Sequence, residues 1–121
     1  MICAPDLSGK SVLVVEDDYS LASDTVAALR TAGAEIIGPC PSVEAAYRTI
    51  DSGLPTAAVL DLSLGGGGPR FEVARKLRGR GVPLIVVTGY QPSVLPDQFK
   101  GVPVLQKPVL MHDVVAAARR L

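Results

Sequence analysis

The sequence predicts an α/β domain in which helices cover both faces of a five-stranded parallel sheet. Short runs of Val, Leu, Ile and Ala alternate along the chain with segments of helical period, which is typical of strand–helix units. Aromatic residues make up only 4% of a chain that is 48% hydrophobic, so the core must be largely aliphatic, as in buried parallel strands. A length of 121 residues fits one domain. We therefore expect a flavodoxin-like (βα)5 doubly wound sheet with strand order 2-1-3-4-5.

The first third of the chain contains two predicted strands around one helix. Ser11–Val15 is an apolar run of the length of a buried strand. Residues 20–32 place Leu and Ala side chains along one side of a helix, and Gly33 stands where a glycine commonly follows a helix end. Residues 35–38 then predict a short second strand, closed by Gly-Pro-Cys-Pro.

The middle of the chain predicts a helix, a strand and a second helix. Ser42 is a good N-cap for a helix whose apolar side chains share one face, namely Val43, Ala46, Tyr47 and Ile50. Residues 57–60 form the third apolar run. After a glycine loop, Pro69 fits the first turn of a helix that continues to about Arg78.

The last third predicts two strands and one long helix. Residues 83–87 and 102–105 are the apolar runs, and residues 109–121 have the pattern of an amphipathic helix. Two prolines interrupt residues 91–101, so we expect the fourth helix to be short or irregular.

Composition limits the cellular context and the partners. Twelve basic and twelve acidic residues cancel, so no global field favours nucleic acid or an anionic membrane. No apolar run approaches the ~18 residues of a membrane helix, and residues 1–10 lack a secretory signal. Cys3 and Cys40 have no metal-ligand spacing and are expected as free thiols. We expect a cytoplasmic protein with an N-terminal extension, residues 1–9, and one domain, residues 10–121.

Polar side chains follow three of the predicted strands at the point where each strand ends. Glu16, Asp17 and Asp18 come after the first strand, Asp61 after the third and Lys107 after the fifth. The carboxyl ends of parallel strands open at one edge, and ligands in this strand order bind between the first and third strands. The sequence therefore predicts a crevice that holds several carboxylates and one lysine.

Such a crevice suits a divalent cation and a phosphoryl group. Two unit charges about 4 Å apart repel by roughly 4 kcal/mol at an effective dielectric constant of about 20, so a carboxylate cluster favours a cation. The expected donors are all oxygens, and Mg²⁺ is the hard cation that fits them best. Thr88 ends the fourth strand at the same edge, where its hydroxyl can bond a phosphoryl oxygen. Taken singly, each residue also has an ordinary explanation: Asp18 as a helix-start residue, Lys107 as a surface lysine.

Four segments together resemble the receiver domain of bacterial two-component response regulators. They are LVVEDD at 13–18, VLDLSL at 59–64, VVTGY at 86–90 and LQKP at 105–108, and the resemblance covers nearly the whole chain. It implies that Asp61 is the phosphoacceptor, which takes a phosphoryl group from a sensor histidine kinase or a phosphotransfer protein. The protein is then not an enzyme beyond reaction with small phosphodonors and its own dephosphorylation.

The resemblance also assigns roles around Asp61. Asp17 binds Mg²⁺ directly, Glu16 directly or through water, and the backbone carbonyl of Ser63 adds a ligand. Lys107 pairs with Asp61 or the phosphoryl oxygens, and Thr88 bonds the phosphoryl group once it is present. The peptide bond between Lys107 and Pro108 is expected to be cis.

The chain departs from the receiver pattern in three places. Four glycines, residues 65–68, replace the usual proline-bearing loop, so we expect either a mobile loop or a permissive linker. Val104 stands where a switch aromatic usually lies, which leaves Tyr90 as a candidate for switching or for tuning dephosphorylation. The run PLIVVTGY at 83–90 is similar to the PFxFATG[Y/G] motif of an alphaproteobacterial subgroup, often found as single domains.

Three functions remain open at this point. The leading one is a receiver that signals through protein contacts, with a homodimer possible, or serves as a phosphate sink. A Mg²⁺-dependent hydrolase of the haloacid-dehalogenase type would need a D-x-D nucleophile motif on the first strand, which Glu16-Asp17-Asp18 does not supply. The third is a pseudo-receiver, an interaction module that is never phosphorylated. No helix-turn-helix extension or basic stripe indicates DNA binding.

Overall fold

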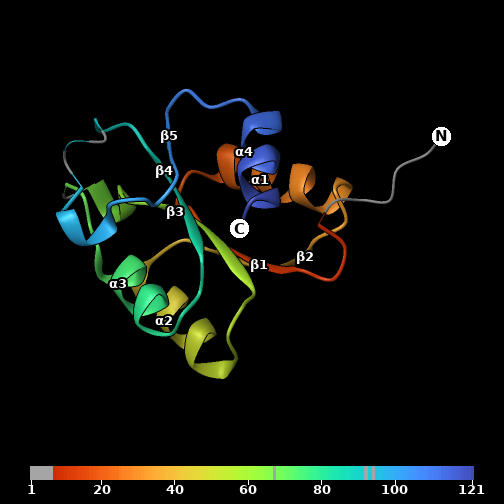
Figure 1. Cartoon of the computed structure of the whole chain (residues 1–121), viewed down its shortest axis with the longest axis horizontal. Helices are drawn as coiled ribbons and strands as arrows, with labels where there is room; N and C mark the ends of the chain where they lie inside the picture. Colours follow the sequence, from red (N-terminus) through yellow and green to blue (C-terminus); the bar gives the residue numbers. More distant parts are fainter. Residues whose placement is uncertain (1–6, 67, 92, 94) are drawn as a thin grey trace.

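The chain folds around a five-stranded parallel sheet, seen in the computed structural model of Figure 1, which describes residues 7–66, 68–91, 93 and 95–121. The strand order is β2-β1-β3-β4-β5 and all neighbouring pairs are parallel, so the predicted order is confirmed. The strands are β1 Ser11–Val15, β2 Glu35–Cys40, β3 Ala57–Asp61, β4 Leu84–Thr88 and β5 Val104–Gln106.

Helices cover both faces of the sheet. Their bounds are α1 Tyr19–Thr31, α2 Val43–Ser52, α3 Glu72–Gly79 and, at the C-terminus, α4 Met111–Arg119. α1 packs beside α4 on one face, and α2 packs beside α3 on the other (Figure 1). This gives the three layers of a doubly wound domain.

Strand side chains alternate between two separate cores. Leu13, Ala58, Leu60 and Val86 pack with α2 and α3. The residues one position away pack with α1 and α4, namely Val12, Val14, Val59, Ile85 and Val87. Burial on both faces explains the continuous apolar runs, because each fully buried Val or Leu contributes about 1.5–3 kcal/mol relative to exposure.

Local capping fixes the starts of the first two helices. The Asp18 carboxylate accepts a hydrogen bond from the Leu21 amide at 2.9 Å, and α1 begins one residue later. The Ser42 hydroxyl accepts from the Ala45 amide at 3.1 Å, so the predicted N-cap of α2 is confirmed. Both caps satisfy amides that have no partner inside the helix.

The second strand runs two residues further than the sequence predicts. β2 ends at Cys40 and contains a cis bond between Gly38 and Pro39, with an irregular register against β1. Gly38 has φ +97°, and a Cβ there would lie 2.9 Å from the Cys40 amide nitrogen and 3.0 Å from the Val14 carbonyl oxygen. Only glycine fits this position without displacement of the β1 backbone.

After β3, one helix starts later than predicted and one segment forms only a short turn. α3 begins at Glu72, so the prediction that Pro69 lies in its first turn is wrong. The Arg70 amide donates to the Leu62 carbonyl at 2.8 Å, which holds the segment after the loop against the end of β3 before the helix starts. A short or irregular helix is expected within residues 91–101, and the described residues of this segment contain a 3₁₀ turn at Asp97–Phe99.

The N-terminal segment joins the domain before β1. Leu7 is fully buried in the α1–α4 core, and its amide donates to the Ala32 carbonyl at 2.9 Å. The Lys10 ammonium donates to the Leu121 carbonyl at 2.9 Å. Leu7 of the expected extension thus packs with the domain, while Cys3 lies outside the described residues. Cys40 is a buried free thiol. None of the helices in the described part of the chain is both long and apolar enough for a membrane span.

Candidate functional site

The candidate site lies where the carboxyl ends of β1, β3 and β5 meet. Glu16 directly follows β1, Asp61 is the last residue of β3, and Lys107 directly follows β5. β1 and β3 are hydrogen-bonded neighbours with Val15 opposite Leu60, so Glu16 and Asp61 leave the sheet side by side. Strand geometry alone therefore brings together residues that are far apart in the sequence.

Three carboxylates form one cluster. Glu16, Asp17 and Asp61 each offer an oxygen, and these oxygens all lie within 4.8 Å of one another. Glu16 is 6% exposed and Asp61 only 2% exposed, whereas Asp17 is open to solvent. The cluster therefore has two buried members and one accessible member, an arrangement open to a ligand from one side.

Lys107 supplies the positive charge of the cluster. Its Nζ donates to Asp61 Oδ2 at 3.2 Å and lies 3.5 Å from Glu16 Oε1. The Lys107 side chain is 28% exposed, so this pair of contacts is shielded from solvent on most sides. One ammonium thus neutralises only part of the charge that three carboxylates carry.

Electrostatics at the site reflect this imbalance. Burial, followed by the hydrogen bond to Asp61, raises the pKa of Glu16 to about 7, against the lowering effect of the Asp18 amide and of Lys107. Burial disfavours the charged Lys107, but attraction to Asp61 and Glu16 outweighs it and raises the pKa of that ammonium. Lys107 is therefore cationic at neutral pH, while Glu16 is close to its midpoint.

This shift makes the stability of the metal-free protein dependent on pH. The pKa of Glu16 is about 7 in the folded chain against 4.5 for the free group, so the folded state holds more protons between these values. Proton binding by Glu16 therefore stabilises the folded state fully below about pH 4.5. This stabilisation is lost as the pH rises through about 7, and the free energy of unfolding falls by about 3 kcal/mol.

We expect urea unfolding in EDTA to show a free energy of unfolding that falls from about pH 5 to about pH 8. The Glu16→Gln variant removes the titrating group and retains a hydrogen-bonding side chain, so its profile should be flatter by this amount. Equal slopes for the parent and Glu16→Gln would contradict the assignment.

The loop after β3 is tied to the acidic cluster. The Ser63 amide donates to Asp61 Oδ1 at 3.0 Å, and the Gly65 amide donates to Asp17 Oδ2 at 3.1 Å. Gly65 has φ +78°, a left-handed conformation that favours glycine. The first glycine of the expected loop therefore holds a carboxylate of the site, a role that composition alone did not indicate; Gly67 lies outside the described residues.

The three acidic residues after β1 have different roles. Asp18 caps α1, one of the two possibilities that the sequence left open. The Asp18 amide donates to Glu16 Oε2 at 3.1 Å, which restrains the carboxylate of Glu16. Glu16 and Asp17 remain for the cluster.

Thr88 and Tyr90 lie at the same edge but outside the carboxylate contacts. Thr88 is fully buried at the end of β4, and its hydroxyl accepts from the Tyr90 amide at 3.0 Å. Within the described residues the Thr88 hydroxyl forms no hydrogen bond to the three carboxylates. The Thr88 carbonyl accepts from the Lys107 amide at 2.8 Å, which joins β4 to β5 beside the site. Tyr90 and Val104 are both half-buried.

The donor set fits a hard divalent cation. All three side chains of the cluster are carboxylates, and the described residues place no thiolate or imidazole among them. One member is open to solvent, which suits Mg²⁺ because this ion retains several water ligands. The bond between Lys107 and Pro108 is cis, as the resemblance implies.

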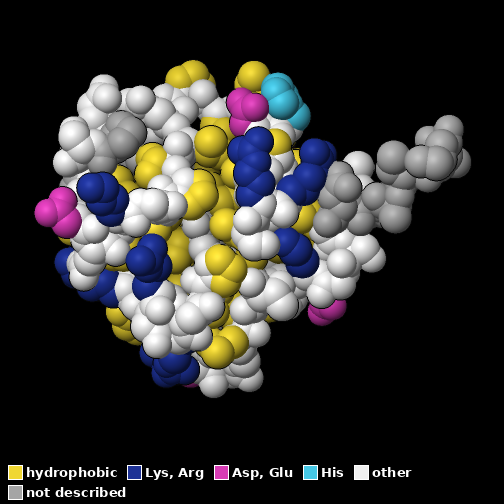
Figure 2. Space-filling view, in the orientation of Figure 1, with side chains coloured by type: hydrophobic (Ala, Val, Ile, Leu, Met, Phe, Trp, Pro, Cys, Tyr) yellow, Lys and Arg dark blue, Asp and Glu magenta, His cyan; other side chains and the backbone are white. Residues whose placement is uncertain are grey.

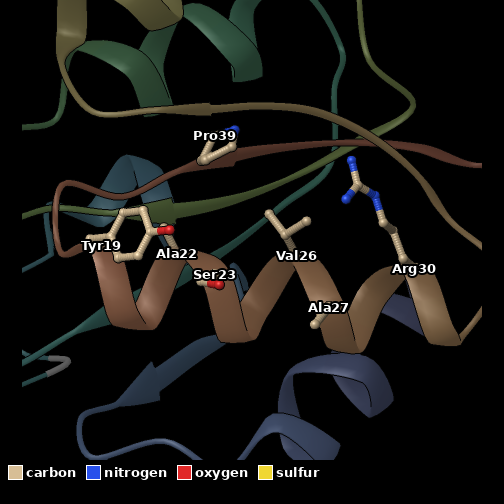
Figure 3. Close-up of a pocket in the computed structure, with 7 residues that line it drawn as sticks. All are labelled: Tyr19, Ala22, Ser23, Val26, Ala27, Arg30 and Pro39. Carbon is tan, nitrogen blue, oxygen red and sulfur yellow. The ribbon is translucent and has the colours of Figure 1, made fainter.

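A separate hollow of about 310 Å³ lies between α1 and the end of β2 (Figure 3). Its lining is mostly apolar, with Tyr19 at one end and Arg30 at the other, and Pro39 faces α1 across it. No carboxylate lines it, so it is distinct from the acidic cluster.

Comparisons with known proteins give structural rather than sequence matches. No protein-family model and no curated protein matches this chain. SdrG from Sphingomonas melonis Fr1 is 31% identical, with a TM-score of 0.77 over 93% of this chain and 94% of its own. The receiver domain of the Erythrobacter litoralis PhyR response regulator is 20% identical, with a TM-score of 0.82 over 93% of this chain and 89% of its own.

The response regulator PhyR from Brucella abortus is 18% identical, with a TM-score of 0.79 over 92% of this chain. The chain spans only 46% of that protein's length. SdrG and this chain share 31% of their residues over nearly their full lengths, and both PhyR structures are response regulators with the same fold. The chain therefore belongs to the response regulator receiver domains.

Proposed function

We propose that this receiver domain is phosphorylated on Asp61 in a Mg²⁺-dependent reaction. The observation that carries the proposal is the carboxylate of Asp61, 2% exposed, in contact with Lys107 and clustered with Glu16 and Asp17. A carboxylate held between one cation and a second cation site is placed for attack on a phosphoryl group. The donor is a phosphohistidine on a sensor histidine kinase or a phosphotransfer protein.

In the transfer step, an Asp61 oxygen attacks the phosphorus of the phosphohistidine. The new oxygen–phosphorus bond forms as the phosphorus–nitrogen bond breaks, and the electron pair stays on the imidazole nitrogen, which takes up a proton. The product is an acyl phosphate on Asp61. Apart from the bond that Asp61 forms, the protein acts by positioning the reacting groups and neutralising their charge.

A metal ion, one lysine and one hydroxyl would stabilise the negative charge on the phosphoryl oxygens. Glu16, Asp17 and the backbone carbonyl of Ser63 would hold Mg²⁺, which neutralises charge on the phosphoryl oxygens when bound. Lys107 already lies 3.2 Å from Asp61 Oδ2 and is the cation that turns toward the new phosphoryl oxygens. The Thr88 hydroxyl ends the adjacent strand and supplies a hydrogen-bond donor to them.

Phosphorylation then acts on the segment after β4. The Thr88 hydroxyl, which accepts from the Tyr90 amide, would turn toward the phosphoryl group, and this alters the hydrogen bonding of Tyr90. A shift from 1:99 to 99:1 between two states would require the phosphoryl group to favour one state by about 5.5 kcal/mol, so we expect a partial shift. Output goes through protein contacts in the cytoplasm or ends in a phosphate sink, and Tyr90 is the candidate for tuning the lifetime of the acyl phosphate.

The test is incubation with acetyl phosphate, with Mg²⁺ or with EDTA, followed by intact mass and peptide mapping. We expect a single phosphoryl group on Asp61 with Mg²⁺ and none with EDTA, and we expect beryllofluoride to bind under the same conditions. Absence of both responses would indicate a pseudo-receiver interaction module. Continuous release of phosphate from phosphate esters would indicate a hydrolase.

A further inference from the structure

Basic residues are concentrated on and around α3. Five of the twelve Lys and Arg residues fall within residues 70–80, which contain one acidic residue, Glu72. They are Arg70, Arg75, Lys76, Arg78 and Arg80. Arg70 pairs with Glu72, and Lys76 and Arg80 pair with Asp51, so the surface keeps a local excess of positive charge in a chain without net charge. Figure 2 shows Lys and Arg side chains over the part of the molecule where Figure 1 places α2 and α3.

Aromatic rings hold two of these cations in place. The Lys76 ammonium lies 4.8 Å from the centre of the Tyr47 ring on α2 and pairs with Asp51 at 2.9 Å. The Arg75 guanidinium lies 5.7 Å from the centre of the Phe71 ring. Cation–π contacts of this kind restrict long side chains before a partner arrives, which lowers the entropy cost of binding.

Other cations of the surface remain open to an outside partner. Arg75 and Arg78 are both exposed, and no carboxylate of the described residues forms an ion pair with either. Between α2 and α3 lies a shallow depression of about 410 Å³, lined by Tyr47, Glu72, Arg75 and Lys76. Its two cations and one aromatic ring outnumber its single carboxylate, which suits a narrow segment that carries carboxylates.

We propose that this surface, made by Tyr47, Arg75, Lys76 and Arg78, docks an acidic segment of a partner protein. Guanidinium groups bind carboxylates through paired hydrogen bonds, and Arg and Tyr are among the residues enriched at the energetic centres of protein interfaces. Tight nucleic-acid binding uses more phosphate contacts than these cations provide, so a short acidic protein segment is the better fit. The proposal goes beyond phosphorylation of Asp61 and does not depend on it.

The test uses a fluorescent peptide of alternating Glu and Leu, a matched peptide with Gln in place of Glu, and a single-stranded DNA. Anisotropy measures affinity, and amide chemical shifts locate the contact. We expect the Glu peptide to bind with shifts confined to α2 and α3, and the Gln peptide to bind at least about tenfold more weakly. Tighter binding of the DNA than of the Glu peptide would overturn the proposal.

Charge reversal identifies the side chains. The double variant Arg75→Glu/Arg78→Glu should lose at least about tenfold in affinity for the Glu peptide. The control Arg30→Glu/Lys100→Glu changes two exposed residues outside this surface by the same charge and should bind like the parent. Equal losses in both double variants, shifts outside α2 and α3, or no binding by the parent would overturn the proposal. If the reversed pair unfolds, Arg75→Gln/Arg78→Gln should give a smaller loss of the same sign.

Discussion

The Asp61→Asn variant is expected to take up no phosphoryl group from acetyl phosphate in the presence of Mg²⁺. The amide oxygen of Asn carries no charge and is a poor nucleophile toward phosphorus, whereas the side chain keeps its shape and its place at the end of β3. Intact mass measured over a time course of acetyl phosphate treatment checks the result. The expected effect is complete loss rather than a slower reaction, because the atom that forms the new bond is removed.

A matched variant separates loss of the nucleophile from loss of an acidic residue. Asp24→Asn makes the same chemical change at an exposed position on α1, outside the acidic cluster, and should be phosphorylated like the parent. If the Asp61→Asn variant took up phosphoryl groups at the parent rate, the phosphoacceptor would be another residue. Asp61→Asn should also lower the pKa of Glu16, because a hydrogen bond and a charge from Asp61 both raise it.

Most of the fold follows from the period of the apolar residues. The central strands β3 and β4 are buried at every position, so each is a continuous aliphatic run up to its last residue. Alternation of such runs with helical segments is typical of parallel sheets. Parallel order then fixes which strand ends meet. The contact of Lys107 with Asp61 and Glu16 is therefore a consequence of topology that sequence order makes predictable.

What the sequence does not predict depends on backbone contacts between distant segments. The start of α3 at Glu72 depends on the bond from the Arg70 amide to the Leu62 carbonyl, and no residue pattern indicates that bond. The contact of the Gly65 amide with Asp17 joins two loops that only the folded sheet brings together. The extension of β2 through a cis bond at Pro39 likewise depends on the close approach of Gly38 to β1.

Replacement of Lys107 by Ala is expected to have opposite effects on phosphorylation and on Mg²⁺ binding. The ammonium lies 3.2 Å from Asp61 Oδ2 and is the only cation of the described residues that contacts the acidic cluster. Loss of one positioned charge from a phosphoryl site should slow acetyl phosphate reactivity about 100- to 1000-fold. The same loss leaves more negative charge on the carboxylates, so Mg²⁺ should bind more tightly, since the lysine and the metal neutralise the same oxygens.

Titration calorimetry of Mg²⁺ and the rate of acetyl phosphate labelling measure the two effects on one preparation. Lys100→Ala removes an exposed lysine that has no contact with the cluster in the described structure, and both quantities should stay at the parent values. If Lys107→Ala weakened Mg²⁺ binding together with labelling, Lys107 would act by holding the site in shape. If labelling continued at the parent rate, the charge would have no part in the transfer, because the geometry of the three carboxylates and the metal would then suffice.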